Sequence, residues 1–342
     1  MNNSNLVGRR IVIVGNRGGT NIGGAFERAA TFFEMNSLLL EPREAMRAPA
    51  WLRRFNWYLR GHRPTRLTAF SRRLVDSCLS HRAEILAVVG IAGVNASSLR
   101  KLAAAGVETI NYLTDDPWNK AHYAPWFMKC LPEYTTVYSP RKSNMIDLRR
   151  AGCRDVRYLP FGYDPLLHFP EPPVVTEAAQ YETDVVFVGG GDSDRVPYCV
   201  GLVRAGISLA LYGDYWRRFQ GTRNLFKGYA DLATLRKATY AAKLCLCLGR
   251  RANRDGHAMR SFEVPAMGGC MLAEDTPEHR EIFGEDGQAV VYFHSIPHLV
   301  ERARWLVARA EERRRLAGAA HALITGGRNT YADRLRTMLE GD

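Results

Sequence analysis

The sequence contains no long run of hydrophobic residues. Its longest apolar stretch runs from Ile85 to Val94, is interrupted by glycines and is far shorter than the roughly 20 residues of a membrane-spanning helix. Residues 1–15 lack the basic start, the apolar segment and the small-residue cleavage site of a secretory signal. We therefore expect a cytoplasmic protein. The 46% hydrophobic and 24% charged content excludes a disordered or fibrous chain, because it is that of an ordinary packed protein.

The cysteines show no pairing pattern. There are seven of them, an odd number, and none belongs to a C-x-x-C pair. This scatter argues against both a disulfide framework and a zinc site. Cys245 and Cys247 alternate in the run LCLCLG, which predicts a buried strand.

Acidic residues are scarce in the first half of the chain. Residues 1–165 hold 24 lysines and arginines against 13 acids, whereas residues 166–342 hold 23 against 22. The net charge of +12 therefore lies almost wholly in the first half, and this asymmetry indicates an anionic partner.

The segment after Trp51 concentrates this positive charge among aromatic residues. Its arginines include Arg53, Arg54 and Arg60. Basic and aromatic residues together suit a membrane interface with anionic lipid, and they also suit a nucleic acid. The alternative is a solvated helix whose aromatics pack on a sheet. We favour a cell-envelope lipid or glycan over nucleic acid, with the protein peripheral on the inner face of the membrane.

Strands and helices alternate along the whole chain, which predicts an α/β fold with parallel sheets. The alternation stops in a proline-rich stretch and then restarts, so we expect two α/β units with a ligand held in the cleft between them. The predicted parts are an N-terminal domain (1–165), a linker (166–183), a second domain (184–325) and a C-terminal helix (326–342).

A first glycine cluster, VGNRGGTNIGG, follows the first predicted strand. Gly18, Gly19 and Asn21 lie where backbone amides can approach a phosphate or sugar. The spacing differs from the dinucleotide pattern G-x-G-x-x-G, but Glu41 falls where a ribose-binding acid of such a fold would stand. A dinucleotide-binding oxidoreductase is therefore an alternative, and a plain strand-to-helix turn is compatible with either.

Two adjacent carboxylates, Asp115 and Asp116, follow another predicted strand in YLTDDPWN. Ligand sites of open α/β sheets lie at such strand ends, so either acid is a candidate base or a ligand of a sugar hydroxyl. An Asp-Pro turn with a helix cap is the alternative.

A second glycine cluster, VGGGDSDR, opens the second unit. Gly189, Gly190 and Gly191 are candidates for cradling a diphosphate, and Arg195 for reaching it. The D-x-D pattern that starts at Asp192 matches one type of metal–diphosphate site, but we favour a helix cap for it.

The segment 250–285 carries the densest set of candidate residues. Arg260 and Glu263 lie three apart near the start of a predicted helix, so they share one face, and His257 precedes them. Arg260 suits a diphosphate and Glu263 suits ribose hydroxyls, although a helix-start salt bridge also explains the pair.

Six stretches in this order resemble the CgeB-like (spore-maturation-protein-type) glycosyltransferases, within the GT-B superfamily. They are TDDPWN, RYLPFGYDP, DVVFVGG, LALYGDYW, HAMRSFEVPAMGG and TPEHREIFG. The resemblance implies two Rossmann-like domains facing a central cleft, an N-terminal acceptor domain (1–165) and a nucleotide-sugar domain (184–325). It also implies no required metal or cofactor, and a C-terminal helix crossing back to the first domain.

The resemblance also assigns roles to two acids. Retaining GT-B enzymes of the glycogen-synthase type have a Glu-x7-Glu pair, in which Glu263 would be the second, ribose-side acid. Asp255 stands where the first glutamate would be, so the retaining assignment stays open.

We therefore predict a metal-independent glycosyltransferase that moves a sugar from a nucleotide-diphosphate sugar to an anionic or membrane-associated acceptor. The alternatives are transfer to nucleic acid, the dinucleotide-dependent oxidoreductase, and an inactive GT-B binding protein.

Overall fold

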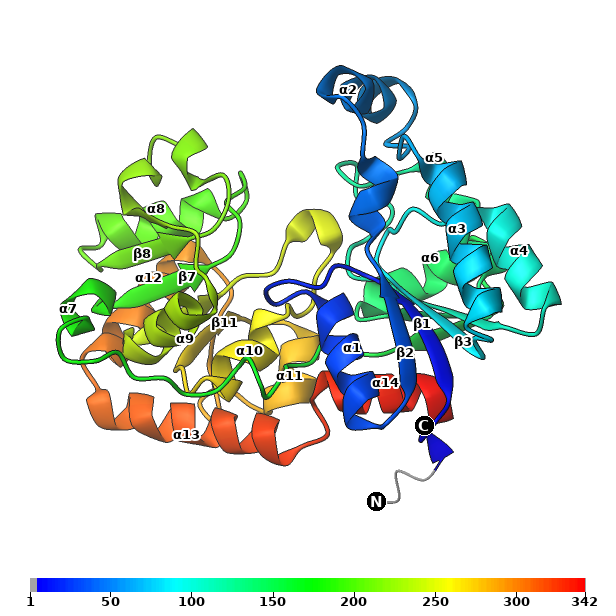
Figure 1. Cartoon of the computed structure of the whole chain (residues 1–342). Coiled ribbons are helices and arrows are strands. Elements are labelled where there is room, and N and C mark those ends of the chain that lie inside the picture. The colour runs from blue at the N-terminus through cyan, green and yellow to red at the C-terminus, as the bar shows by residue number, and fades with distance from the viewer. Residues whose placement is uncertain (1–4, 342) are drawn as a thin grey trace. The chain divides into compact units, whose positions relative to one another are not determined.

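The computed structural model describes residues 5–341 and divides the chain into two units. Unit 1 comprises Met1–Pro160, Ala252–Arg254 and Tyr331–Asp342, and unit 2 comprises Phe161–Arg251 and Asp255–Thr330. Each unit contains one parallel six-stranded sheet with helices between the strands (Figure 1). The predicted α/β class with two Rossmann-like halves is confirmed.

Unit 1 is built on a sheet with the strand order β2-β1-β3-β4-β5-β6. Its strands are β1 (Arg10–Val14), β2 (Asn36–Leu40), β3 (Ile85–Val89), β4 (Glu108–Tyr112), β5 (Thr136–Ser139) and β6 (Asp155–Tyr158). Its helices are α1 (Ile22–Phe32), α2 (Ala50–Leu59), α3 (Leu67–Ser80), α4 (Ala96–Ala104), α5 (Pro125–Met128), α6 (Met145–Arg150) and α14 (Tyr331–Glu340).

Helices cover both faces of this sheet, which explains why β1 is apolar from Ile11 to Val14. Val12 and Val14 belong to a buried core that includes Leu74 of α3. The alternate residues of β1 point to the opposite face, because successive side chains of a strand alternate. There, α1 and α14 pack together, with the rings of Phe26 and Tyr331 in edge contact at 5.9 Å. The C-terminal helix is thus part of unit 1.

Unit 2 repeats the design with the strand order β12-β11-β10-β7-β8-β9. Its strands are β7 (Val185–Val188), β8 (Leu209–Tyr212), β9 (Phe226–Gly228), β10 (Leu244–Cys247), β11 (Met271–Glu274) and β12 (Val291–Phe293). Its helices are α7 (Ala178–Tyr181), α8 (Val196–Arg204), α9 (Leu232–Ala241), α10 (Arg260–Ala266), α11 (Pro277–Phe283), α12 (Ile296–Val307) and α13 (Ala310–Gly326).

The proline-rich stretch predicted as a linker, 166–183, belongs to unit 2 and packs along α9. Arg236 pairs with Glu171 at 2.5 Å, and its guanidinium lies over the ring of Phe169. Lys237 pairs with Glu177, also at 2.5 Å. These contacts hold the stretch against unit 2, although its prolines prevent regular secondary structure over most of its length.

Within residues 5–341, none of the helices is long and apolar enough to cross a membrane.

Candidate functional site

The second glycine cluster forms a tight loop at the carboxyl end of β7. The Gly189 and Gly191 amides donate to the carbonyls of Tyr212 and Asp214, at 2.9 and 2.8 Å. Space is limiting here, because a Cβ atom added to Gly191 would lie 2.8 Å from the ring of Trp216. Trp216 is fully buried and its indole nitrogen donates to the Gly189 carbonyl at 2.8 Å. Glycine at 191 is therefore required by packing.

Arg195 holds this loop from inside the unit. Its guanidinium donates to the carbonyls of Gly190 and Leu248, at 3.0 and 3.1 Å, and the residue is 7% exposed. Burial lowers the pKa of Arg195. Asp192 Oδ1 accepts from the backbone amides of Asp194 and Arg195, at 3.0 and 2.9 Å, in the turn that leads into α8. The capping role that we favoured for Asp192 is not what the structure shows: the N-cap of α8 is Arg195, without a side-chain cap hydrogen bond, and Asp192 instead closes the turn before the helix. Arg195 positions the loop.

Arg260 brings the two motifs of unit 2 together. Its Nε donates at 3.1 Å to the carbonyl of Val188, the residue directly before the glycine loop. Its Nη1 pairs with Glu263, whose side chain has no exposed surface. On the other side of this carboxylate, His168 Nε2 lies 3.5 Å away and is equally buried. Contact between Glu263 and a ribose therefore requires the Arg260 side chain, which is 24% exposed, to move aside.

His257 and Asp255 lie before this helix and make backbone contacts. His257 is buried and its Nε2 accepts from the Phe161 amide at 3.3 Å. Asp255 is partly exposed, and its Oδ2 accepts from the Arg250 amide at 2.9 Å. Both side chains stabilise loops next to the candidate donor residues, and their proposed roles toward a donor stay predictions.

In unit 1, the predicted carboxylates differ sharply in their surroundings. Asp116 is 1% exposed, accepts from the Trp118 amide at 2.9 Å, and pairs with Arg254 at 2.6 Å. Asp115 is partly exposed, and Asn253 Nδ2 donates to its Oδ1 at 3.0 Å. The segment Ala252–Arg254, from the second half of the sequence, thus completes unit 1 around both acids.

His122 is a candidate residue that sequence reasoning missed. Its Nε2 lies 3.6 Å from Asp115 Oδ1, and both side chains are 34% exposed. The signal for it was weak, since a histidine in a loop without a motif has no expected partner. A search for titratable residues in the loop after β4 would have found it.

The first glycine loop is less tightly packed against neighbouring residues than the second. Gly18 and Gly19 are exposed, and a Cβ atom at either position would meet nothing within 4 Å. Asn21 donates from Nδ2 to the Gly18 carbonyl. The close backbone contacts occur at Gly15 and Gly23 instead, where an added Cβ would lie 2.6 Å from the other residue. A ligand role for the exposed loop remains a prediction.

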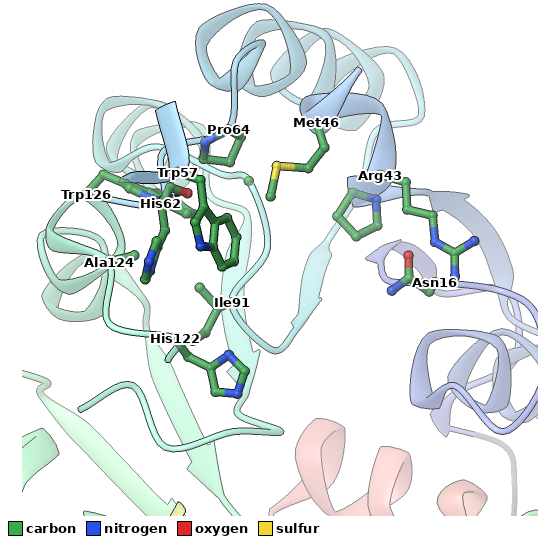
Figure 2. Close-up of a pocket in the computed structure, with 12 residues that line it drawn as sticks. Asn16, Arg43, Met46, Trp57, His62, Pro64, Ile91, His122, Ala124 and Trp126 are labelled. Carbon is green, nitrogen blue, oxygen red and sulfur yellow. Dashed lines mark hydrogen bonds between the residues drawn. The ribbon is translucent and has the colours of Figure 1, made fainter. Parts of the chain in front are cut away.

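A pocket of about 240 Å³ opens in unit 1, and we call it the tryptophan pocket (Figure 2). Residues from several loops line it: Asn16, Pro42, Arg43, Met46, Trp57, His62, Pro64, Ile91, Gly93, His122, Ala124 and Trp126. Figure 2 shows Trp57, Ile91 and His122 around the same space.

A neighbouring hollow of about 410 Å³, the arginine pocket, shares Met46 and Trp57 with it. Its remaining lining residues come from α2 and the turn after it: Ala50, Arg53, Arg54, Tyr58, Arg63 and Thr65. On α2, only Asn56 is buried. Trp51 and Tyr58 are 70% and 78% exposed. The helix therefore presents aromatic and basic side chains to its surroundings instead of contributing them to the core.

The described residues include no cluster of three or more histidine, cysteine, aspartate or glutamate side chains that could hold a metal ion.

The chain is similar to known proteins in sequence over part of its length and in fold over nearly all of it. Residues 200–340 match a family model described as glycosyl transferase-like, and no curated protein sequence matches the chain. Among solved structures, the chain is similar to sucrose-phosphate synthase from Thermosynechococcus elongatus, with 13% identity, a TM-score of 0.66, and 97% and 98% of the two chains covered.

Two further structures of similar fold bind uridine nucleotides. HepE from Anabaena, in complex with UDP, is 12% identical with a TM-score of 0.63, and 98% of this chain and all 100% of HepE are covered. UDP-GlcNAc 2-epimerase from Neisseria meningitidis, bound to UDP-GlcNAc, is 11% identical with a TM-score of 0.56 and the same coverage. At such identities the likeness concerns the fold, which can carry more than one chemistry. The chain has the GT-B fold, and its residues 200–340 match a glycosyl transferase-like family model, in agreement with the enzyme class expected from the sequence.

Proposed function

We propose that the protein is a CgeB-like glycosyltransferase that moves a sugar from a nucleotide-diphosphate sugar to an anionic acceptor. One observation carries the donor half of this proposal. Arg260 links the start of α10 to the end of β7, so the glycine loop and the Arg260–Glu263 pair adjoin, although 72 positions separate Val188 from Arg260. A cation and a glycine-rich loop at the carboxyl end of a strand suit a diphosphate.

In this proposal, donor binding rearranges the Arg260–Glu263 pair. The diphosphate draws the Arg260 guanidinium away from Glu263, and the freed carboxylate binds the ribose hydroxyls. Arg260 then stabilises the negative charge that develops on the departing nucleoside diphosphate, a role that requires no metal ion. The Gly190 amide is the loop amide that binds the diphosphate in this proposal, because the amides of Gly189 and Gly191 already donate to Tyr212 and Asp214. Arg195 stabilises the conformation of the loop through its hydrogen bonds to the carbonyls of Gly190 and Leu248.

The arginine pocket supports an anionic acceptor in unit 1. Arg53, Arg54 and Arg63 surround it, with the rings of Trp57 and Tyr58 between them. Such a mixture binds a phosphate or carboxylate group next to an apolar part, as in an anionic lipid or a lipid-linked glycan. We therefore propose that α2 contacts the membrane surface that carries the acceptor.

The donor proposal is tested with a panel of sugar nucleotides that includes UDP-glucose and UDP-GlcNAc. We expect slow release of the free nucleoside diphosphate as water replaces the acceptor. Conversion of UDP-GlcNAc to its 2-epimer would instead indicate an epimerase. Binding of NAD(P)H in a fluorescence titration would favour the oxidoreductase, and binding without turnover the inactive protein.

The acceptor proposal is tested by co-sedimentation with vesicles. Binding should require phosphatidylglycerol, weaken with salt, and fall at least tenfold in Arg53→Glu/Arg54→Glu/Arg60→Glu. The control reverses three exposed arginines of the same unit, on α6 and beyond it: Arg149, Arg150 and Arg154. Equal binding of both variants would contradict a specific role of α2, and tighter binding to RNA than to vesicles would favour a nucleic-acid acceptor.

A further inference from the structure

The buried carboxylate of Glu263 faces a different partner through each of its two oxygens. Oε2 pairs with Nη1 of Arg260, and Oε1 lies 3.5 Å from Nε2 of His168. The side chains of Glu263 and His168 are buried, whereas that of Arg260 reaches the surface. All three residues belong to unit 2. One partner of the carboxylate can therefore move out toward solvent, while the other stays enclosed by the protein.

The ring of His168 is fixed by the turn from Asp164 to His168, where the proline-rich stretch begins. The His168 amide donates to the Asp164 carbonyl at 2.8 Å, and Asp164 Oδ1 accepts from the Leu166 amide at 3.0 Å. The Asp164 amide donates to Nδ1 of the imidazole, also at 3.0 Å. The turn therefore determines the direction of the ring and places Nε2 toward Glu263.

The same contact determines the tautomer of His168. A backbone amide can only donate, so Nδ1 accepts through its lone pair and the proton of the neutral imidazole is on Nε2. Nε2–H then points at Glu263 Oε1. A carboxylate removed from water needs donors from the protein, and a neutral histidine supplies one without burying a second positive charge.

Donor binding affects the two partners of Glu263 differently. In the proposed function, the diphosphate draws Arg260 away from Oε2, and that oxygen then accepts from the ribose hydroxyls. A buried carboxylate that loses its guanidinium tends to take up a proton or to rotate about its side-chain bonds. The Nε2–H of His168 opposes both changes, because it favours the ionised form and keeps Oε1 in place.

We propose that His168 is the positioning residue of the ribose site: it keeps Glu263 Oε1 in place while Oε2 exchanges Arg260 for the ribose hydroxyls. This inference rests on the proposed function and adds a residue that lies outside every motif singled out in the sequence. The preference for a ribose over a sugar without hydroxyls then depends on His168, whereas binding of the diphosphate depends on Arg260.

The test is calorimetric titration of UDP, ADP and GDP, and of their 2′,3′-dideoxy analogues, which lack both ribose hydroxyls. Wild type should bind at least one of the three about tenfold more tightly than its analogue, because hydrogen bonds to a charged group are lost in the analogue. Two variants separate the contacts of His168. In His168→Asn, Oδ1 replaces Nδ1 as the acceptor for the Asp164 amide, and no donor reaches Glu263. In His168→Gln, the longer side chain keeps a donor for Glu263 and gives up the acceptor in the turn.

His168→Asn should reduce the ribose preference to about threefold or less through weaker binding of the ribonucleotide alone, and His168→Gln should retain it. A role in the turn alone predicts the reverse. That result, or a wild-type preference in His168→Asn, would overturn the inference while leaving nucleotide binding at Arg260 standing. Equal affinity of wild type for a ribonucleotide and its analogue would overturn it as well. If His168→Asn does not fold, His168→Gln decides alone, since loss of the preference there contradicts the inference.

The matched control is His321→Asn. His321 lies on α13 and donates from Nδ1 to the Pro265 carbonyl at 2.9 Å, so it contacts the same helix as Glu263 without facing the carboxylate. This variant should keep the wild-type ribose preference. Loss of the preference in both variants would assign the effect to α10 as a whole and overturn the role of His168. A wild-type protein that binds none of the three nucleotides would overturn the proposed function itself.

Discussion

Arg195 allows the donor loop to be tested without any knowledge of the donor. The sequence suggested that this arginine reaches a phosphate, whereas the structure places its guanidinium behind the loop, bound to the carbonyls of Gly190 and Leu248. Arg195→Met keeps roughly the length of the side chain but removes both donors, together with the guanidinium that lies over the Phe187 ring. The two carbonyls then lose their partners in a region that excludes water.

The size of the effect follows from these contacts. Each hydrogen bond from a charged donor contributes about 1.5–3 kcal/mol, so the pair sets an upper limit of roughly 6 kcal/mol. The variant no longer has to bury a guanidinium, which offsets part of this loss. We therefore expect the free energy of unfolding to fall by about 2–4 kcal/mol. Arg195→Lys should lose less stability, because the lysine ammonium group can still make one of the two hydrogen bonds that the guanidinium makes.

The assay is urea denaturation followed by tryptophan fluorescence, since Trp216 is fully buried beside the loop. Arg204→Ala is the matched control, because Arg204 is an exposed arginine at the end of the same helix, α8. If Arg195→Met unfolds like wild type and instead abolishes UDP binding, Arg195 is a phosphate ligand and the positioning role is refuted.

Three further predictions concern the metal, the loop and pH. Activity should survive EDTA, because Arg260 and the Gly190 amide take the place of a metal ion; loss restored by Mn²⁺ or Mg²⁺ would make Asp192 and Asp194 metal ligands. Gly191→Ala should cost about 1–3 kcal/mol of stability in the same urea assay, since the new methyl group overlaps the Trp216 ring, and unchanged stability would contradict this. Burial lowers the pKa of His279 from 6.5 to about 4, so the folded state keeps it neutral while the unfolded chain binds a proton. Stability should therefore be full above pH 6.5 and fall by at most about 3 kcal/mol toward pH 4, and His279→Gln should reduce this slope in urea titrations.

Local patterns were sufficient to predict the architecture. Runs such as IVIV in β1 and LCLC in β10 are apolar on both faces, and such runs are typical of parallel strands covered on both sides. The pairing of Arg260 with Glu263 could also be predicted, because the two residues are close in sequence and share a helical turn. Residues three positions apart lie on the same face of any helix, so this pairing can be predicted without knowledge of the tertiary structure.

The acceptor half could not be predicted in the same way. Asp116 meets Arg254 across 138 positions, and the tryptophan pocket combines residues from several separate loops. Periodicity determines which face of an element is buried, but it carries no information on which loops meet at the edge of a sheet. His122 was therefore overlooked, and Asp115 and Asp116 were treated as equivalent although only one of them is buried.

In the proposed function, unit 2 binds a nucleotide-diphosphate sugar at the Arg260–Glu263 pair. The most direct measurement is calorimetric titration of UDP, UDP-glucose and the corresponding ADP, GDP and dTDP compounds into wild type and Arg260→Gln/Glu263→Gln. Replacing both members avoids a buried charge without a partner. We predict that at least one nucleotide binds the wild type, and that the double variant binds it at least tenfold more weakly while unfolding at a similar urea concentration. Equal affinity in the two proteins, or no binding of any nucleotide to the wild type, would contradict the account.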